Sequence, residues 1–218
     1  MTAIDDPGAF ILAHTQLRPV PHAPELLLHV ADEITPIWRM TEQALAATGL
    51  APPFWAFAWA GGQAIARYLL DNPHEAAGRR VLDLACGSGL CAIAAMKAGA
   101  RSALAVDIDP LCAAAVALNS TANGVAVDCK IEDMLGRPAP KVDLILAGDI
   151  CYEKPMAERA LAWLYDARTA GAHVLIGDPG RSYFPADGLD LLADYQVPTT
   201  RELEDMDIKR TRVWTIPS

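Results

Sequence analysis

The stretch Val81–Leu90, VLDLACGSGL, constrains the fold of this chain more than any other. A short apolar run leads directly into Gly87-Ser88-Gly89, and an apolar, Ala-rich segment follows as far as Lys97. Glycine allows positive φ and a close approach of the backbone to a ligand. The first turn of a helix has free N–H groups and a partial positive charge. The stretch therefore predicts a buried strand, a tight turn and a helix start that together cradle a ligand.

The carboxylate of Asp83, just before this turn, limits which ligand can bind there. It disfavours a phosphate and favours a ligand that is cationic or donates hydrogen bonds. Residues 87–92, GSGLCA, also fit the GxGxxA pattern of nicotinamide-dependent dehydrogenases. Two features count against a dehydrogenase: Asp83 would repel a pyrophosphate, and about 80 residues precede a motif that dehydrogenases usually place near their start.

The composition of the 218-residue chain limits the classes of protein to which it can belong. The length and the 52% content of hydrophobic residues predict one globular domain, residues 1–218, with a sizeable core. A net charge of −9 argues against nucleic-acid binding, because neutralising phosphates requires Lys and Arg. Such a surface suits a basic protein partner instead, and we expect the protein to be a monomer.

Cysteine and histidine usage predicts a reducing compartment and no metal. The five cysteines are scattered without a CxxC pair, which indicates free thiols in the cytoplasm. The five histidines lack the spacing of metal ligands.

No apolar run reaches the roughly 18 residues that cross a bilayer. The acidic start, MTAIDDPGAF, resembles neither a signal peptide nor a transit peptide, so we expect a cytoplasmic protein without a membrane partner.

Residues 1–58 predict a helical extension that precedes the core. Asp6-Pro7 predicts a helix start, because proline fits the first helical turn. Residues 14–24 are rich in proline and predict a connector, and residues 25–31 predict either a strand or an irregular edge segment. Thr35-Pro36 opens a second predicted helix, which Gly49 ends.

Residues 59–218 predict the core, in which strands alternate with helices. The expected strands are 81–85, 103–107, 125–131, 142–147 and 173–177, and the expected helices are 90–98, 110–123 and 154–170. Apolar strands that alternate with helices indicate a parallel, doubly wound sheet with helices on both faces. Two further stretches, 194–200 and 211–216, predict an antiparallel hairpin at the sheet edge, because no helical pattern joins them.

Polar residues lie at the carboxyl ends of the predicted parallel strands, where ligands of such sheets bind. They are Asp83 with the glycine turn, Asp107-Ile108-Asp109, Glu132-Asp133, Gly148-Asp149 with Tyr152-Glu153, and Asp178 with Gly180-Arg181. Asp107 comes 107 − 89 = 18 residues after Gly89, close to the spacing of about 20 expected for a carboxylate that binds ribose hydroxyls. We expect Asp109 to cap a helix and Cys86 to be a small residue of the pocket wall.

The stretch Trp59-Ala60-Gly61-Gly62 is also unusual. Two glycines at a helix start are costly unless the backbone must approach something closely. The stretch predicts either a lining of the ligand pocket, which we expect for Trp59, Gly61 and Gly62, or a buried packing segment. Packing is the expectation for Phe54 and Phe57.

Five motifs, in order along the chain, carry a resemblance to a known family. The pattern DxxCGxG at 83–89, followed by an acidic second strand end, resembles motif I of the seven-strand S-adenosylmethionine methyltransferases. Within that class, the chain is similar to the lysine methyltransferases that act on the electron transfer flavoprotein β subunit. The motifs are WAGGQAIARYLLDNP, VLDLACGSG, DIDP, GDICYE and IGDPGR, and they span residues 59–181. The DxxY signature is here Asp149 to Tyr152.

The resemblance implies a Rossmann-like seven-strand α/β sheet, mostly parallel with a reversed C-terminal hairpin, and S-adenosylmethionine as the cofactor. It implies Asp107 on the ribose, Asp133 near the adenine amino group, and Asp149 and Tyr152 at a lysine channel. The expected cofactor-binding residues are together Trp59, Gly61, Gly62, Asp83, Cys86, Gly87, Gly89, Asp107, Ile108, Asp133 and Gly148. Because the chain is rich in alanine and starts without a transit peptide, we expect a bacterial member.

Methyl transfer to a lysine requires its neutral amine. For a pKa near 10.4, neutralising the amine at pH 7 costs about 3.4 pKa units, or roughly 4.6 kcal/mol. A carboxylate favours the ammonium form, so we assign Asp149 to capturing and orienting the incoming lysine. Tyr152 either orients the amine or walls the channel, and Glu153 completes the expected catalytic set.

Several alternatives stay open. The substrate is either the electron transfer flavoprotein β subunit, another protein such as a ribosomal protein, or a small molecule, and a non-catalytic cofactor-binding module is a further possibility. Asp149 could instead cap the helix that starts at Lys154, and Glu153 could be only a first-turn helix charge. Arg181 pairs with Asp178 or Asp149, or faces the substrate. The acidic stretch 202–207 is either a solvated turn or a docking face.

Overall fold

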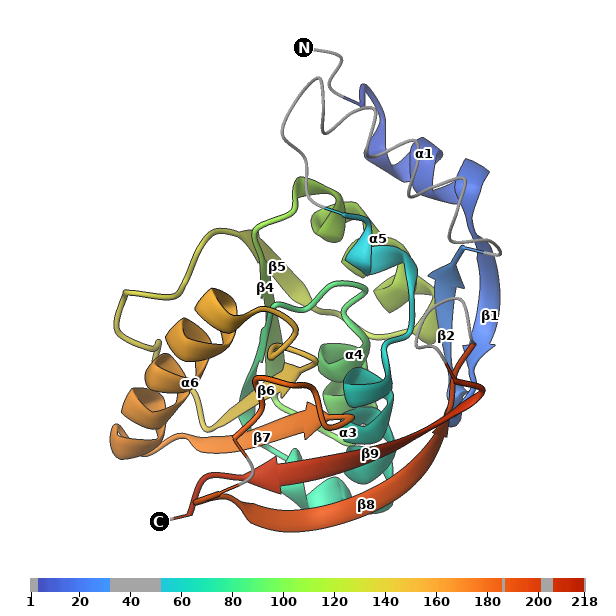
Figure 1. The fold of residues 1–218 in the computed structure, drawn as a ribbon. Coiled ribbons are helices and arrows are strands. Elements are labelled where there is room, and N and C mark those ends of the chain that lie inside the picture. Colours follow the sequence, from blue (N-terminus) through green and yellow to red (C-terminus); the bar gives the residue numbers. More distant parts are fainter. Residues whose placement is uncertain (1–3, 32–51, 186, 201–205, 218) are drawn as a thin grey trace.

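The computed structural model describes residues 4–31, 52–185, 187–200 and 206–217. Its large sheet consists of β3 (Arg80–Leu84), β4 (Ser102–Asp107), β5 (Asp128–Ile131), β6 (Leu144–Gly148), β7 (His173–Asp178), β8 (Asp190–Pro198) and β9 (Ile208–Thr215). These seven strands lie in the order β5-β4-β3-β6-β7-β9-β8 (Figure 1). Strands β3 to β7 pair in parallel, whereas β9 runs antiparallel to both β7 and β8. The predicted mostly parallel sheet with a reversed terminal hairpin is confirmed.

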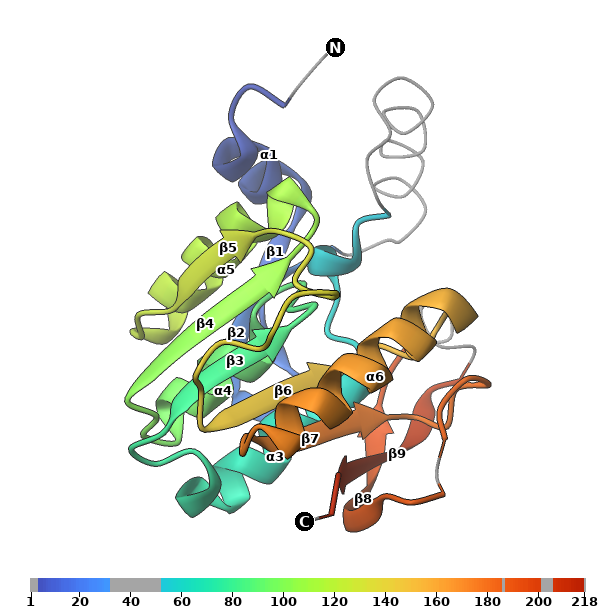
Figure 2. The same cartoon turned by 90° about the vertical axis from the view of Figure 1, so that its left-hand side faces the viewer.

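Helices cover both faces of this sheet. Helices α3 (Ala60–Asp71), α4 (Leu90–Lys97) and α5 (Pro110–Asn123) lie on one face, and α6 (Lys154–Thr169) lies on the other (Figure 2). Successive strand residues point to opposite faces: Val81 joins the core beneath α3, α4 and α5, and Leu82 joins the core beneath α6. The apolar strands are therefore buried on both sides, as a parallel sheet requires.

The predicted element boundaries hold best where local signals are strong. Helix α5 begins after Asp109, whose Oδ1 accepts the N–H of Leu111 (2.9 Å), and it ends at Gly124, which has φ 65°. Strand β5 is shorter than the predicted 125–131. It starts only at Asp128, because the N–H of Val125 still bonds to the carbonyl of Ser120 in the end of α5.

The N-terminal extension combines a helix with a β-hairpin. Helix α1 (Pro7–His14) starts as predicted, with Asp6 Oδ1 accepting the N–H of Ala9 (2.9 Å). The predicted connector over residues 14–24 is wrong, because β1 (Gln16–Val20) pairs antiparallel with β2 (Ala23–Val30). The predicted helix over residues 35–49 and most of the acidic stretch 202–207 lie outside the described residues.

Side-chain amides of α5 bind the backbone of β2. The amide of Asn123 accepts the N–H of Leu27 (2.9 Å) and donates to the carbonyl of the same residue (2.6 Å). Asn119 Oδ1 accepts the N–H of His29 (2.8 Å), and Asn119 Nδ2 donates to the carbonyl of Ser88 (2.9 Å). The two amides therefore supply hydrogen-bond partners to β2 in addition to its pairing with β1. Asn119 also links β2 to the glycine turn after β3.

Two short 3-10 helices, η1 (Phe54–Ala56) and η2 (Pro73–Glu75), flank α3.

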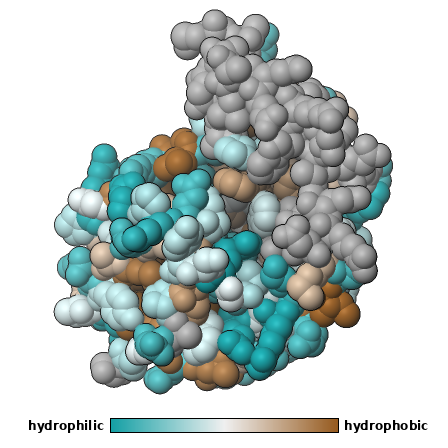
Figure 3. Space-filling model, in the orientation of Figure 1, coloured by the Kyte–Doolittle hydropathy of each residue, from teal (hydrophilic) through white to brown (hydrophobic). Residues whose placement is uncertain are grey.

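In the space-filling view, polar residues cover much of the visible face, and apolar residues appear between them in separate small groups (Figure 3). Scattered apolar residues of this kind are ordinary on a protein surface.

Candidate active site

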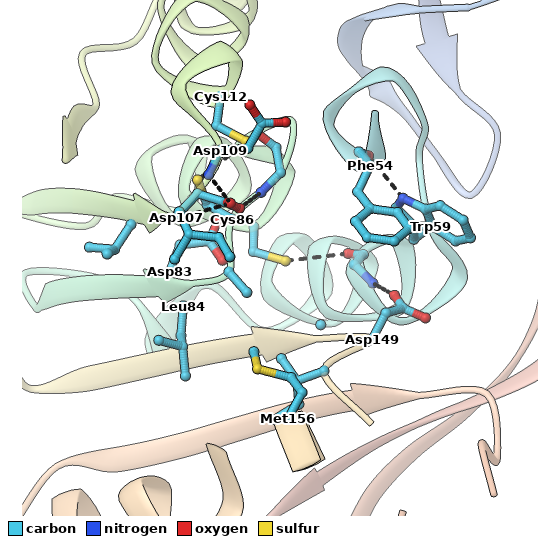
Figure 4. Close-up of a pocket in the computed structure, with 18 of the residues that line it drawn as sticks. Phe54, Trp59, Asp83, Leu84, Cys86, Asp107, Asp109, Cys112, Asp149 and Met156 are labelled. Atoms are coloured by element: carbon cyan, nitrogen blue, oxygen red, sulfur yellow. Dashed lines mark hydrogen bonds between the residues drawn. The ribbon is translucent and has the colours of Figure 1, made fainter. Parts of the chain in front are cut away.

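A cavity of about 360 Å³ lies at the carboxyl ends of β3, β4 and β6 (Figure 4). Chain order reverses at this point, because β4 and β5 extend the sheet from one side of β3 and β6 and β7 extend it from the other. Ligands of open α/β sheets bind at such a switch point. The fold therefore places the cavity where the sequence predicts a ligand.

The turn after β3 requires its positive-φ residues. Gly87 has φ 49° and Gly89 has φ 79°, and Ala85, which is not a glycine, has φ 53°. A Cβ on Gly89 would lie 2.9 Å from a methyl of Val116 in α5. Gly89 thus serves the packing of the turn on α5 and is not among the lining residues.

Asp107 ties the second strand end to this turn. Its Oδ2 accepts the N–H of Gly87 (2.9 Å), and its Oδ1 accepts the N–H groups of Ile108 (2.7 Å) and Asp109 (3.0 Å). Three backbone donors therefore fix one carboxylate on the cavity wall, where Ile108 lies exposed beside it.

Asp83 is buried and supports the start of α4. Its Oδ2 accepts the N–H of Ala92 (2.9 Å), in the first turn of that helix. Burial raises the pKa of Asp83 to about 8, and the charge of Asp107 adds to the rise, while the bond from Ala92 opposes it. Asp83 lines the cavity as expected, and its predicted contact with a cationic ligand stays a prediction.

The glycines of the WAGG stretch let α3 lie directly on the ends of β6 and β7. A Cβ on Gly61 would overlap the carbonyl of Gly177 in β7, and a Cβ on Gly177 would overlap the carbonyl of Gly61. A Cβ on Gly148 in β6 would lie 2.9 Å from the N of Gly62. The close approach expected of these glycines is therefore to backbone: Gly61 packs against β7, whereas Gly62 and Gly148 line the cavity.

Asp149 lies at the point where α3, β6 and β7 meet. It has φ 58°, a conformation that is uncommon for a residue with a side chain and that often occurs at functional sites. Its Oδ2 accepts the N–H of Gly62 (3.0 Å), and its Oδ1 pairs with Nη2 of Arg181 (2.8 Å). Burial raises the pKa of Asp149. The positive charge of Arg181 opposes this rise, and the negative charge of Asp178 reinforces it.

Aromatic side chains form the wall next to Asp149. The indole N–H of Trp59 donates to the carbonyl of Phe54 (2.9 Å), and the rings of these two residues lie edge to face with centroids 5.6 Å apart. The ring of Phe54 also lies 5.3 Å from that of Tyr152. Tyr152, 43% exposed, therefore stands at the mouth of the cavity, and burial raises the pKa of its hydroxyl.

Asp133 contributes to the opposite rim. Its Oδ2 pairs with Nη2 of Arg159 (2.8 Å), and its Oδ1 accepts the N–H of Leu135 (3.0 Å). The hydrogen bond from Arg159 lowers the pKa of Asp133. The carboxylate is thus held charged at the cavity edge by a residue of α6 that sequence reasoning did not single out.

Most predicted site residues meet at this cavity. Those that line it are Trp59, Gly62, Asp83, Cys86, Gly87, Asp107, Ile108, Asp133, Gly148, Asp149 and Tyr152. Gly61, Gly89 and Glu153 do not line it. Glu153 is exposed at the N-cap position of α6, which also rules out Asp149 as the cap of that helix.

Sequence reasoning missed several lining residues. Phe54 and Phe57, expected only to pack, line the cavity as well, and the aromatic-rich stretch FWAFAW was the available signal. Met156 and Arg159 also line it, and neither stands in a pattern that distinguishes it from a surface or packing residue. Arg181, for which the sequence leaves open a pair with Asp178 or Asp149 or a place facing the substrate, lines the cavity and pairs with Asp149.

Two further properties concern the part of the chain that the structure describes. It holds no group of three or more His, Cys, Asp or Glu side chains placed to bind a metal ion. None of its helices combines the length and the apolar character needed to cross a lipid bilayer.

Comparisons with known proteins agree with the geometry. The family model of the ribosomal protein L11 methyltransferase (PrmA) matches residues 65–152. The chain is 37% identical over 220 residues to the electron transfer flavoprotein beta subunit lysine methyltransferase of Xenopus laevis, covering 98% of this chain and 88% of that protein. It is 39% identical over 217 residues to the protein of the same name from Danio rerio, covering 96% of this chain and 83% of that protein.

A solved structure shares the fold. Magnesium protoporphyrin IX methyltransferase from Synechocystis PCC 6803, crystallised with bound SAM, matches with a TM-score of 0.52 at 19% identity, covering 72% of this chain and 79% of that one. At this identity the likeness concerns the fold alone.

Proposed function

The chain belongs to the family of electron transfer flavoprotein β subunit lysine methyltransferases, and from this premise we propose that it methylates a lysine of the electron transfer flavoprotein β subunit. The enzyme is an S-adenosylmethionine-dependent protein-lysine N-methyltransferase. The observation that carries the proposed substrate is the identity of 37% and 39% to relatives of that name, over nearly the whole chain.

The chemistry of the cavity fits S-adenosylmethionine. The carboxylate of Asp107 complements a ligand that is positively charged at sulfur and nitrogen and that carries ribose hydroxyls. Burial raises the pKa of Asp83 to about 8, and a cation bound beside Asp83 would favour its charged form. The apolar side chains of Leu84, Met134 and Leu135 suit an adenine ring. When bound, this cofactor supplies the methyl group on its sulfonium. A pyrophosphate, by contrast, would be repelled by the carboxylate of Asp107.

The proposal gives the following roles to residues that line the cofactor half of the cavity. Asp107, held by three backbone N–H groups, presents its carboxylate to the ribose hydroxyls. Asp133 accepts from the adenine amino group while it stays paired with Arg159. Gly87 keeps the turn open beside the cofactor, and Trp59 closes the cavity over the reacting end. The other proposed cofactor-lining residues are Gly62, Cys86, Ile108 and Gly148.

The lysine half is assigned to Asp149 and Tyr152. Asp149 captures the ammonium of the incoming lysine and orients it, and Tyr152 at the mouth walls the path to it. Removal from water favours the neutral amine, which is the nucleophile. Positioning of two reactants can contribute roughly 7–11 kcal/mol to lowering a barrier, so the site can work without a strong general base.

We propose the remaining properties from charge and composition. The net charge of −9 supports a basic protein partner and not nucleic acid or a membrane. The cysteines are all free, which supports a reducing, cytoplasmic compartment, and the alanine content supports a bacterial source. We take residues 59–218 as the catalytic core, residues 1–58 as its extension, and the protein as a monomer, which light scattering would test.

The test of the function uses the whole protein. Wild-type enzyme is incubated with methyl-labelled S-adenosylmethionine and, in parallel, with purified electron transfer flavoprotein and with ribosomal proteins. Label on a lysine of the flavoprotein β subunit, located by peptide mass spectrometry, supports the proposal. Label only on a ribosomal protein would transfer the function to the second candidate, which the match to the L11 methyltransferase family model favours.

Two other outcomes would contradict methylation of a protein. Label in a filtrate from which macromolecules have been removed would indicate a small-molecule substrate. Binding of S-adenosylmethionine without label on any substrate would indicate a non-catalytic module.

A further inference from the structure

Arg181 connects the two halves of the site. Its Nη2 lies 2.8 Å from Oδ1 of Asp149, and its guanidinium lies over the ring of Trp59 with 5.8 Å to the ring centroid. Its side chain is 20% exposed, and that of Asp149 is 11% exposed. Arg181 also lines a second, polar groove of about 270 Å³, formed by residues 179–183 with Tyr152 and Lys209. Arg181 and Tyr152 are therefore the shared wall between the cavity and this groove.

The turn after β7 holds Arg181 in this position. Oδ1 of Asp178 accepts the N–H groups of Gly180 and Arg181, both at 2.7 Å, and Gly180 has φ 86°. The backbone of Arg181 is thus fixed from β7, while its side chain reaches the carboxylate that follows β6. Such a mostly buried pair is screened by water much less than a surface ion pair.

This pairing bears on a difficulty in the proposed chemistry. A lone buried carboxylate would hold the incoming lysine as an ammonium ion, and an ammonium ion cannot accept a methyl group. We infer that Arg181 is a positioning residue that neutralises Asp149, so that Asp149 can orient the substrate amine without keeping it protonated. The inference rests on the proposed lysine methylation and adds to it a residue that sets the charge balance of the lysine channel.

The groups around Asp149 allow this role. Arg181 and the N–H of Gly62 oppose the effect of burial on the pKa of Asp149, whereas the carboxylate of Asp178 reinforces it. The thiols of Cys91 and Cys151 also interact electrostatically with Asp149, and burial raises the pKa of both, so they stay neutral near pH 7. Among these groups, Arg181 is the cation that can balance Asp149.

The test compares three variants with the wild type across pH. Arg181→Met removes the charge and keeps an apolar stem, and Arg181→Lys keeps the charge. Arg80→Met is the matched control, because Arg80 pairs with Asp143 at the same distance of 2.8 Å but in an exposed position at the opposite end of the sheet. Turnover, the KM for the flavoprotein and the dissociation constant for S-adenosylmethionine are measured from about pH 6.5 to about pH 10.

We expect Arg181→Met to shift the rise of kcat with pH upward by about one unit, since the amine then stays protonated by Asp149. At pH 7.5 this corresponds to a loss of about tenfold in kcat, which shrinks as the pH rises. The KM should not rise, because the ammonium still meets a carboxylate. Arg181→Lys should keep the wild-type pH profile, and Arg80→Met should match the wild type throughout.

Other outcomes overturn the inference. An equal loss at every pH, or a profile of Arg181→Lys that moves with that of Arg181→Met, would make Arg181 a structural residue. If the wild type labels no lysine, the proposed function fails instead, so the two failures are distinguishable.

A second measurement does not depend on activity. The deficit in melting temperature of Arg181→Met should grow from about pH 5 to about pH 8, as the unpaired Asp149 ionises, and this growth should vanish in an Asp149→Asn background. A deficit that is independent of pH, or whose growth with pH persists in the Asp149→Asn background, would contradict the pairing on which the inference depends.

Discussion

The contact between α3 and β7 gives a sharp prediction, because it leaves no room for a single methyl group. In the variant Gly61→Ala, the new Cβ would overlap the carbonyl of Gly177 and would lie 2.6 Å from Oδ2 of Asp149. The obstacle is backbone, which cannot rotate away as a side chain can. The first turn of α3 must therefore move away from the sheet and take the N–H of Gly62, a donor to Asp149, with it.

The size of the effect follows from two opposing terms. Over-packing costs up to about 3 kcal/mol, and a contact with backbone belongs at the upper end of that range. Replacing glycine by alanine in a helix returns up to about 1 kcal/mol. The net loss of about 2 kcal/mol lowers the melting temperature by about 4–8 °C for a chain of this length. Turnover should fall by about a hundredfold, because a displacement of about 1 Å at an active site has that consequence.

The neighbouring glycine provides the stability control. A Cβ on Gly62 would meet only side-chain atoms of Leu90 and Cys91, at 3.7 and 3.8 Å, which is ordinary contact. Gly62→Ala should therefore melt at or slightly above the wild-type temperature. Gly177→Ala tests the same contact from the other side and should resemble Gly61→Ala. Differential scanning calorimetry measures the melting temperature, and the labelling assay measures turnover. A Gly61→Ala protein that melts at the same temperature as Gly62→Ala and keeps wild-type turnover would refute the close approach of α3 to β7.

Three further variants test separate parts of the molecule. Asp107→Ala should weaken S-adenosylmethionine binding at least tenfold by isothermal titration calorimetry, because three backbone donors lose their acceptor along with the proposed ribose contact; an unchanged affinity would exclude that contact. Asp149→Ala should bind the cofactor within a few-fold of wild type and transfer no methyl group, and normal turnover would remove it from the lysine channel. Asn123→Ala leaves the N–H and carbonyl of Leu27 without their partner. It should cost about 1–3 kcal/mol in unfolding free energy, and a denaturant midpoint equal to that of the wild type would show that β2 does not depend on this amide.

The parts of the fold that the sequence predicts are those with local causes. The strand, turn and helix around 81–97 follow from an apolar run, two glycines and an Ala-rich segment within a few residues of one another. Helix α5 follows from Asp109-Pro110 at one end and Gly124 at the other. The parallel, doubly wound character of the sheet follows from the alternation of apolar strands and helices together with the right-handedness of crossovers.

The parts that sequence reasoning missed have partners far along the chain. The sequence leaves residues 25–31 as either a strand or an irregular edge segment, because the amides of Asn119 and Asn123 that bind β2 come from about 90 residues away. Strand β1, which pairs with β2, lies in the stretch expected to be a connector. Gly61 was expected at the cavity, yet its neighbour is Gly177. The need for glycine was visible in the sequence, whereas the identity of the approaching backbone depends on the order of β6 and β7 in the sheet.

The same long-range packing divides the site into two halves with different electrostatics. In the proposed cofactor half, Asp107 is held by backbone N–H groups, which are fixed dipoles and leave the negative charge available to a cationic ligand. In the proposed lysine half, Asp149 is held by one N–H and by the full positive charge of Arg181, which on our inference balances its charge. A site that must attract a sulfonium and then accept an uncharged amine beside it needs this contrast. If both carboxylates were unbalanced, the second cation would bind well and react poorly.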